Sequence, residues 1–288
     1  MKLFLMLGIV SFVYPFIRFI LTYPSIIIWQ DYNGAVVASY LGITISFVLS
    51  SIFLLRYLEN SSNTNNQKIK LNLSYFSPLL PIVLINLLYS TINFGDVIFA
   101  RRYFNEVETD IFAIASTIAK ANTFVIFPIS YIVLPRMIED FKLRGYKSSI
   151  MALVKGVILG TLASIAYFLF ILIFGDIILK IFGERYLEAK KILPYFTVAF
   201  IPISLSFILI NYSITFKNWY FIIPLVISNI SMVGGFILFH NTFEEMITVI
   251  LISGSITLVS LLLIVVLSKE PKIEISEEEI LSEETTQT

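Results

Sequence analysis

The stretch FGDVIFARRYF is almost wholly apolar, yet it holds Asp96, Arg101 and Arg102 close together. Two more charged side chains, Arg18 and Lys120, also stand inside long apolar runs. In a bilayer, an ionisable side chain is costly unless it faces protein or a water-filled cavity, and such residues often bind ions or charged substrates. These side chains are therefore candidates for holding a charged ligand within a membrane.

The position of each charge along its apolar run separates a structural role from a binding role. Lys120 lies near the middle of its run, so it either faces a cavity or extends its stem to an interface. Arg18 is four or five residues from the end of its run, which favours snorkelling to the interface. Asp96 requires a partner at this depth. Arg101 or Arg102 could pair with it at the outer interface, and Lys120 on the next helix is also in reach. An ion pair of structural role is the simpler interpretation of Asp96.

Composition places these residues in a membrane protein. Of the 288 residues, 57% are hydrophobic and 14% charged, whereas soluble domains carry about 25% charged residues. The mean hydropathy is +0.88. Zero net charge gives no indication of a nucleic-acid partner, and the absence of cysteine excludes disulfides and thiolate metal sites. With one histidine, a histidine metal cluster is excluded too. We expect no cofactor and no metal.

Continuous apolar runs predict an all-α, polytopic membrane bundle of about eight transmembrane helices, because each crossing takes about 20 apolar residues. The predicted spans are 3–22, 34–55, 75–97, 111–135, 152–174, 192–214, 219–239 and 246–267. The chain is thereby divided into two helices (1–57), a polar cytoplasmic linker (58–74), a six-helix lobe (75–267) and an acidic disordered tail (268–288).

Prolines, small residues and amides predict how these helices are shaped and packed. Pro128 and Pro135 are expected to close the fourth span. Gly156 and Gly160, one turn apart, would permit a close approach of two helices. Interhelical hydrogen bonding is expected of four amides within or near spans: Asn86, Asn93, Asn122 and Asn211.

The distribution of basic residues predicts the orientation. Twelve Lys and Arg residues fall on the side that holds both termini, and six fall on the other side. The richer side is cytoplasmic by the positive-inside rule. We therefore expect a multi-pass protein of the cell membrane with both termini in the cytoplasm.

Two stretches resemble polysaccharide flippases of the multidrug/oligosaccharidyl-lipid/polysaccharide (MOP) exporter superfamily, which includes the MATE transporters. The first stretch is FGDVIFARRYFNEVETDIFAIASTIAKANTFVIFPISYIVLPRM, and the second is IFGERYLEAKKIL. The family pattern is matched in the first by Asp96, Ala100, Arg101, Phe104, Glu106, Ala115, Ile118, Lys120, Pro135 and Arg136, and in the second by Phe182, Gly183, Tyr186 and Ala189. The chain departs from the pattern at DIFA, where the family usually has Gly-x-Tyr.

The resemblance implies an alternating-access transporter that moves lipid-linked oligosaccharides. Because the sequence shows no nucleophile–base pair and no phosphate-cradling Gly-rich loop, we expect no ATPase or other enzyme activity of its own. A cation in the cavity would hold the phosphate of the cargo. The candidate substrate-binding residues are Lys120 first, then Arg18, Asp96 and Arg101. The implied partners are the lipid-linked glycan, membrane lipids and a second lobe or second copy of the chain, with no nucleic acid.

The family has two pseudo-symmetric lobes, so the eight predicted spans would form the end of a first lobe and a complete second lobe. Roughly four N-terminal spans of the family pattern are then missing. One alternative is a partial or split transporter subunit that does not transport alone. Another is a membrane enzyme of glycan assembly, such as a polymerase or glycosyltransferase, although its usual acidic pair and large outer domain are not in this sequence.

Overall fold

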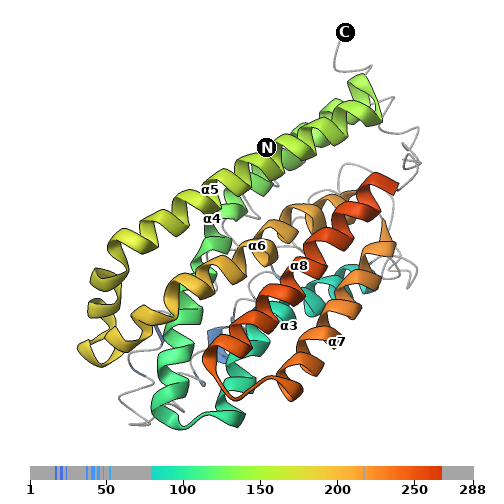
Figure 1. The fold of residues 1–288 in the computed structure, drawn as a ribbon. Helices are drawn as coiled ribbons and strands as arrows, with labels where there is room; N and C mark the ends of the chain where they lie inside the picture. Colours follow the sequence, from blue (N-terminus) through green and yellow to red (C-terminus); the bar gives the residue numbers. More distant parts are fainter. Residues whose placement is uncertain are drawn as a thin grey trace. The chain divides into compact units, whose positions relative to one another are not determined.

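The structure is a computed structural model that describes residues 79–216 and 218–267, together with twelve helical positions between residues 17 and 52 (Figure 1). The chain divides into two compact units, Met1–Leu73 and Ser74–Thr288. The first two predicted spans, the linker and the acidic tail lie outside the continuously described residues.

Six long helices make up the described part of the second unit. Their bounds are α3 (Leu79–Tyr103), α4 (Glu106–Arg144), α5 (Tyr146–Phe182), α6 (Leu193–Thr215), α7 (Ile222–Leu238) and α8 (Phe243–Leu267), with two short 3-10 helices, η2 (Glu184–Lys191) and η3 (Trp219–Phe221). All six are long and apolar enough to cross a membrane, η3 being continuous with α7. The chain is thus a polytopic helical membrane protein, while the predicted total of eight spans stays a prediction.

Helix α4 is much longer than its predicted span of 111–135. It has 39 residues, about 58 Å at about 1.5 Å per residue. It begins with a capping box, in which the Asn105 side chain accepts from the Glu108 amide at 2.9 Å and the Glu108 side chain accepts from the Asn105 amide at 3.2 Å. It ends at Gly145, whose φ of 83° is one that glycine adopts readily.

The expectation that Pro128 and Pro135 close this span is wrong, because both lie inside α4. Proline removes one helical hydrogen bond, and neighbouring helices can compensate for that loss in a membrane bundle. Figure 1 shows α4 bending along its length before it follows α5. The two prolines therefore belong to a continuous, bent helix.

Helix α6 is the centre of the bundle and α5 lies at its periphery. Of the apolar window of α6, 67% is buried, against 17% for α5. Helix α6 packs against α4, α5 and α8, and α7 packs against α3 and α8. Most of the α5 surface is therefore free of contacts within the bundle.

Two glycines of α5 let it approach its neighbours closely, as their spacing predicts. A Cβ atom on Gly156 would lie 2.7 Å from Val133 of α4, and one on Gly160 would lie 3.0 Å from both Ile208 and Leu205 of α6. A larger residue at either position would force these helices apart.

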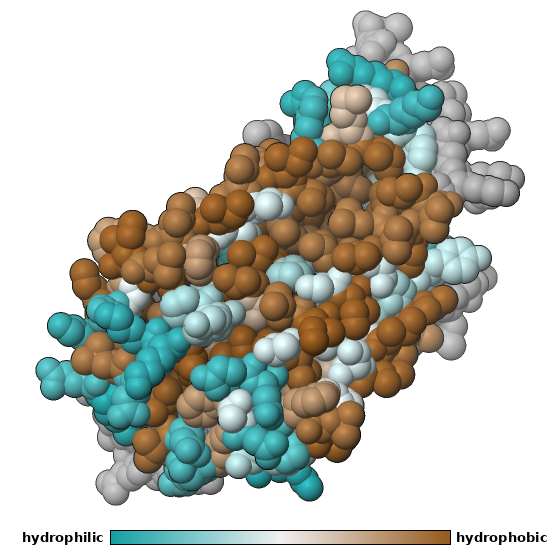
Figure 2. Space-filling model, in the orientation of Figure 1, coloured by the Kyte–Doolittle hydropathy of each residue, from teal (hydrophilic) through white to brown (hydrophobic). Residues whose placement is uncertain are grey.

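The face drawn in Figure 2 carries a broad apolar area between two groups of polar residues. Large hydrophobic residues on α5, such as Ile158, Leu162 and Ile173, are exposed. A contiguous apolar surface of this extent is unusual for a soluble protein and is suited to lipid.

Candidate functional site

An ion pair between α3 and α4 lies inside the bundle. The Lys120 ammonium donates a hydrogen bond to Asp96 Oδ1 at 2.6 Å, and the side chains of Asp96 and Lys120 are 0% and 11% exposed. Asp96 lies seven residues before the end of α3, so it is deeper than its predicted place at the helix end. Of the three partners considered for Asp96, namely Arg101, Arg102 and Lys120, the structure selects Lys120.

Helical periodicity explains why these side chains meet. On α3, Tyr89, Ile92, Asp96 and Ala100 recur every three or four residues and form the buried face. On α4, Ser116 lies one turn before Lys120, so both point toward the same neighbour. The Ser116 hydroxyl donates to Asp96 Oδ2 at 2.5 Å, and each carboxylate oxygen thus accepts a hydrogen bond.

Two phenylalanine rings flank the Lys120 ammonium. The ring centroids of Phe94 and Phe200 lie 5.5 Å and 5.2 Å from Nζ, a distance at which cation–π attraction operates. Phe200 is completely buried, whereas Phe94 is 61% exposed. The ammonium therefore lies between the bundle interior and a ring at the surface of the lobe.

Hydrogen bonds between uncharged groups join α3, α4 and α6 on the side of the ion pair that faces the C-terminal end of α4. Thr123 of α4 and Ser204 of α6 have hydroxyl oxygens 3.0 Å apart. Tyr89 of α3 donates to the Ile203 carbonyl at 3.3 Å. These polar contacts extend from the ion pair along the interior surface that α3, α4 and α6 share.

The interhelical role predicted for the amides holds for two of the four. Asn122 donates to Ser164 of α5 at 3.1 Å, and Asn211 donates to Ser130 of α4 at 3.0 Å. Among the described residues, Asn86 donates instead to the Ile82 carbonyl of its own helix. Asn93 is buried, and its Oδ1 has no partner among the described residues.

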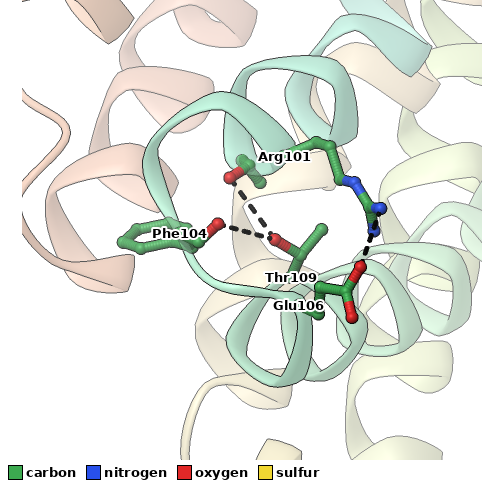
Figure 3. A network of polar contacts seen from close by, with 5 residues as sticks. Arg101, Phe104, Glu106 and Thr109 are labelled. Atoms are coloured by element: carbon green, nitrogen blue, oxygen red, sulfur yellow. Dashed lines mark hydrogen bonds and ion pairs between the residues drawn. The ribbon is translucent and has the colours of Figure 1, made fainter.

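Arg101 lies away from the ion pair. It is in the last turn of α3, is largely exposed, and pairs with Glu106 at 3.3 Å (Figure 3). Nearby, the Thr109 hydroxyl in the first turn of α4 donates a hydrogen bond to the Phe104 carbonyl at 3.4 Å. This bond ties the start of α4 to the end of α3. Arg18 lies outside the described residues.

The site is suited to holding charge. In the described part of the chain, no three His, Cys, Asp or Glu residues gather as a metal site. Lysine has three N–H donors, and Asp96 is the one ionic partner of Lys120 among the described residues. An anion that reached Lys120 would compete with Asp96 for these donors.

The residues around the ion pair were only partly identifiable from sequence. Ser116 has a recognisable signal, because it lies one turn before Lys120. Phe94 and Phe200 have none, since the chain contains 26 phenylalanines and no spacing marks these two.

Comparison with known proteins gave no match to a family model, a curated protein or a solved structure.

Proposed function

We propose that the chain is a transporter that flips lipid-linked oligosaccharides or polysaccharide precursors across the cell membrane by alternating access. The observation that carries the proposal is the Asp96–Lys120 pair inside a membrane-spanning bundle, beside the exposed ring of Phe94. Intramembrane ion pairs are rare and tend to mark substrate or ion pathways. The resemblance of two sequence stretches to MOP polysaccharide flippases supplies the substrate class.

The ion pair offers a way to bind and release an anionic cargo. The Asp96 carboxylate accepts one hydrogen bond from Ser116 and one from the Lys120 ammonium. A phosphate that reached the ammonium would compete with the carboxylate for the N–H donors of Lys120. The same competition from the carboxylate would favour release of the cargo.

The remaining parts of the proposal concern the surroundings of the site. The chain performs no bond chemistry, lies in the cell membrane with both termini in the cytoplasm, and works among membrane lipids. A second lobe or a second copy of the chain completes the cavity that holds the cargo.

Reconstitution tests the proposal directly. Liposomes that contain the full chain and a polyprenyl-diphosphate oligosaccharide are treated with an external glycosidase, and transfer is read as the rate at which inner-leaflet glycan becomes cleavable. Lys120→Ala should abolish transfer. Lys190→Ala is the matched control, because Lys190 pairs with Asp176 at the same 2.6 Å but at the surface.

Three outcomes are informative. Loss of transfer in Lys120→Ala alone, in liposomes where that variant is folded, supports the proposal. Equal rates in the unchanged chain and Lys120→Ala remove Lys120 from the mechanism. No transfer by the unchanged chain, in liposomes where it is folded, contradicts transport by this chain alone.

A further inference from the structure

The α4–α5 hairpin contains a groove with a cationic rim. The groove encloses about 400 Å³ between the last turns of α4 and the first turns of α5. Its charged lining consists of Arg136, Asp140 and Arg144 from α4 and Lys155 from α5. The apolar lining includes Ile132, Met151 and Leu159, all of which are well exposed.

The charges of the groove are not balanced within the hairpin. Arg144 pairs with Asp140 at 3.5 Å, while Arg136 and Lys155 have no ion pair with any described residue. Residues 136–155 carry five basic and two acidic side chains. The first turn of α5 has no acidic residue and no side-chain cap, so its positive helix end adds to the potential.

The groove lies level with the ends of neighbouring helices. Phe141 contacts Phe216, just past the end of α6, at 5.4 Å between ring centroids, and the Tyr146 hydroxyl lies 3.4 Å from the Val265 carbonyl near the end of α8. At the same end of the bundle, Tyr220 is exposed, as is typical of aromatic residues at a membrane interface. The groove is therefore at the depth of lipid headgroups.

We infer that this groove binds an anionic phospholipid of the surrounding bilayer. The phosphate lies between Arg136 and Lys155, and an acyl chain lies along Ile132, Met151 and Leu159. Basic pockets between transmembrane helices on the cytoplasmic side are suited to anionic headgroups. Because α5 is the least buried of the six described spans, lipid reaches the groove directly from the bilayer.

The apolar and charged parts of the groove together select this ligand. Free phosphate would leave the apolar lining unoccupied, and a zwitterionic lipid would bring a positive group to a cationic rim. The site is separate from Lys120, which lies sixteen residues before Arg136 on α4, about 24 Å away along the helix. Lipid retention here does not depend on glycan transport.

Native mass spectrometry of the full chain tests the inference. The purified protein is titrated with phosphatidylglycerol or with phosphatidylcholine of the same acyl chains, and bound lipid is counted. The test variant is Arg136→Gln/Lys155→Gln. The matched control is Lys142→Gln/Lys147→Gln, which removes the same charge from the same hairpin outside the groove. An unchanged thermal unfolding midpoint shows that each variant is folded.

The expected result is preferential retention of phosphatidylglycerol, weakened at least about tenfold in the test variant, since one charge-assisted hydrogen bond contributes about 1.5 kcal/mol. The control should bind like the unchanged chain. Equal weakening in both variants would show diffuse surface attraction and overturn the inference. Equal binding of phosphatidylglycerol and phosphatidylcholine would overturn the inference as well. Two competitors are then added to the protein with bound phosphatidylglycerol. Displacement of that lipid by inorganic phosphate, or its preferential displacement by a polyprenyl diphosphate, would each overturn the inference.

Discussion

Asp96 and Lys120 form an ion pair of 2.6 Å in which the carboxylate is completely buried. Each charge has been removed from water, so each depends on the other for compensation. Asp176 and Lys190 form a pair of the same length at the surface, where water solvates both groups. These two pairs differ chiefly in burial, which makes their comparison informative.

Removing one member of the buried pair should destabilise the protein strongly. We expect Asp96→Asn to lower the free energy of unfolding by about 3–5 kcal/mol, because it leaves the Lys120 charge buried without a partner. The double variant Asp96→Asn/Lys120→Met should recover most of that loss. Denaturant unfolding in detergent of the two single variants and the double variant gives the coupling free energy.

The control cycle uses Asp176→Asn and Lys190→Met, for which coupling of at most about 1 kcal/mol is expected at an exposed site. Additive effects of Asp96→Asn and Lys120→Met would contradict the pairing that the structure shows.

Two adjacent glycines of α7 should respond oppositely to the same substitution. A Cβ atom on Gly235 would lie 2.6 Å from Val249 of α8, whereas one on Gly234 would have nothing within 4 Å. Gly235→Ala should therefore cost about 1–3 kcal/mol through overpacking. Gly234→Ala should be neutral or stabilise by up to about 1 kcal/mol through helix propensity. Thermal unfolding in detergent measures both.

A third variant identifies the cause. This variant is Gly235→Ala/Val249→Ala, in which truncation of Val249 removes the methyl groups that the new methyl group at position 235 would meet. That new methyl group then fills the space that Val249→Ala leaves empty. The double variant should therefore be more stable than Val249→Ala alone. A loss in Gly234→Ala as large as that in Gly235→Ala would refute the packing explanation.

The existence of six helices was predictable from sequence, but their ends were not. Apolar windows detect the part of a helix that lies in hydrocarbon, and α4 continues beyond it at both ends. Its limits are set by Asn105 and Gly145, which are local signals of capping and of positive φ. The prolines misled the prediction because a membrane bundle tolerates Pro128 and Pro135 inside a helix.

The partner of Asp96 shows what periodicity can decide and what requires tertiary structure. Arg101 is five residues beyond Asp96 on the same helix, about 140° around it, so it reaches a different face. That much follows from sequence. The choice of Lys120 depends on the register between α3 and α4, which no local pattern specifies. The flanking Phe200 comes from a third helix and was likewise beyond prediction.

The crossing of the membrane by α4 can be tested by labelling single cysteines, because the chain contains none of its own. The two variants are Arg102→Cys and Lys142→Cys. Arg102 is exposed and lies in the last turn of α3, just before α4 begins, and Lys142 is exposed and lies near the end of α4. In whole cells, a membrane-impermeant maleimide should label Arg102→Cys directly and Lys142→Cys only after permeabilisation. Leu162→Cys, in the exposed apolar face of α5, should resist labelling in both conditions because lipid covers it.

Each pattern of labelling has a separate meaning. Labelling of both Arg102→Cys and Lys142→Cys from one side would contradict a membrane crossing between them. It would also contradict the orientation proposed for the bundle in the bilayer. Labelling from opposite sides in the reverse order would keep the crossing and overturn the orientation predicted from the basic residues. In that case the cationic groove of the α4–α5 hairpin would face the outer leaflet, and the anionic lipid it binds would have to come from there.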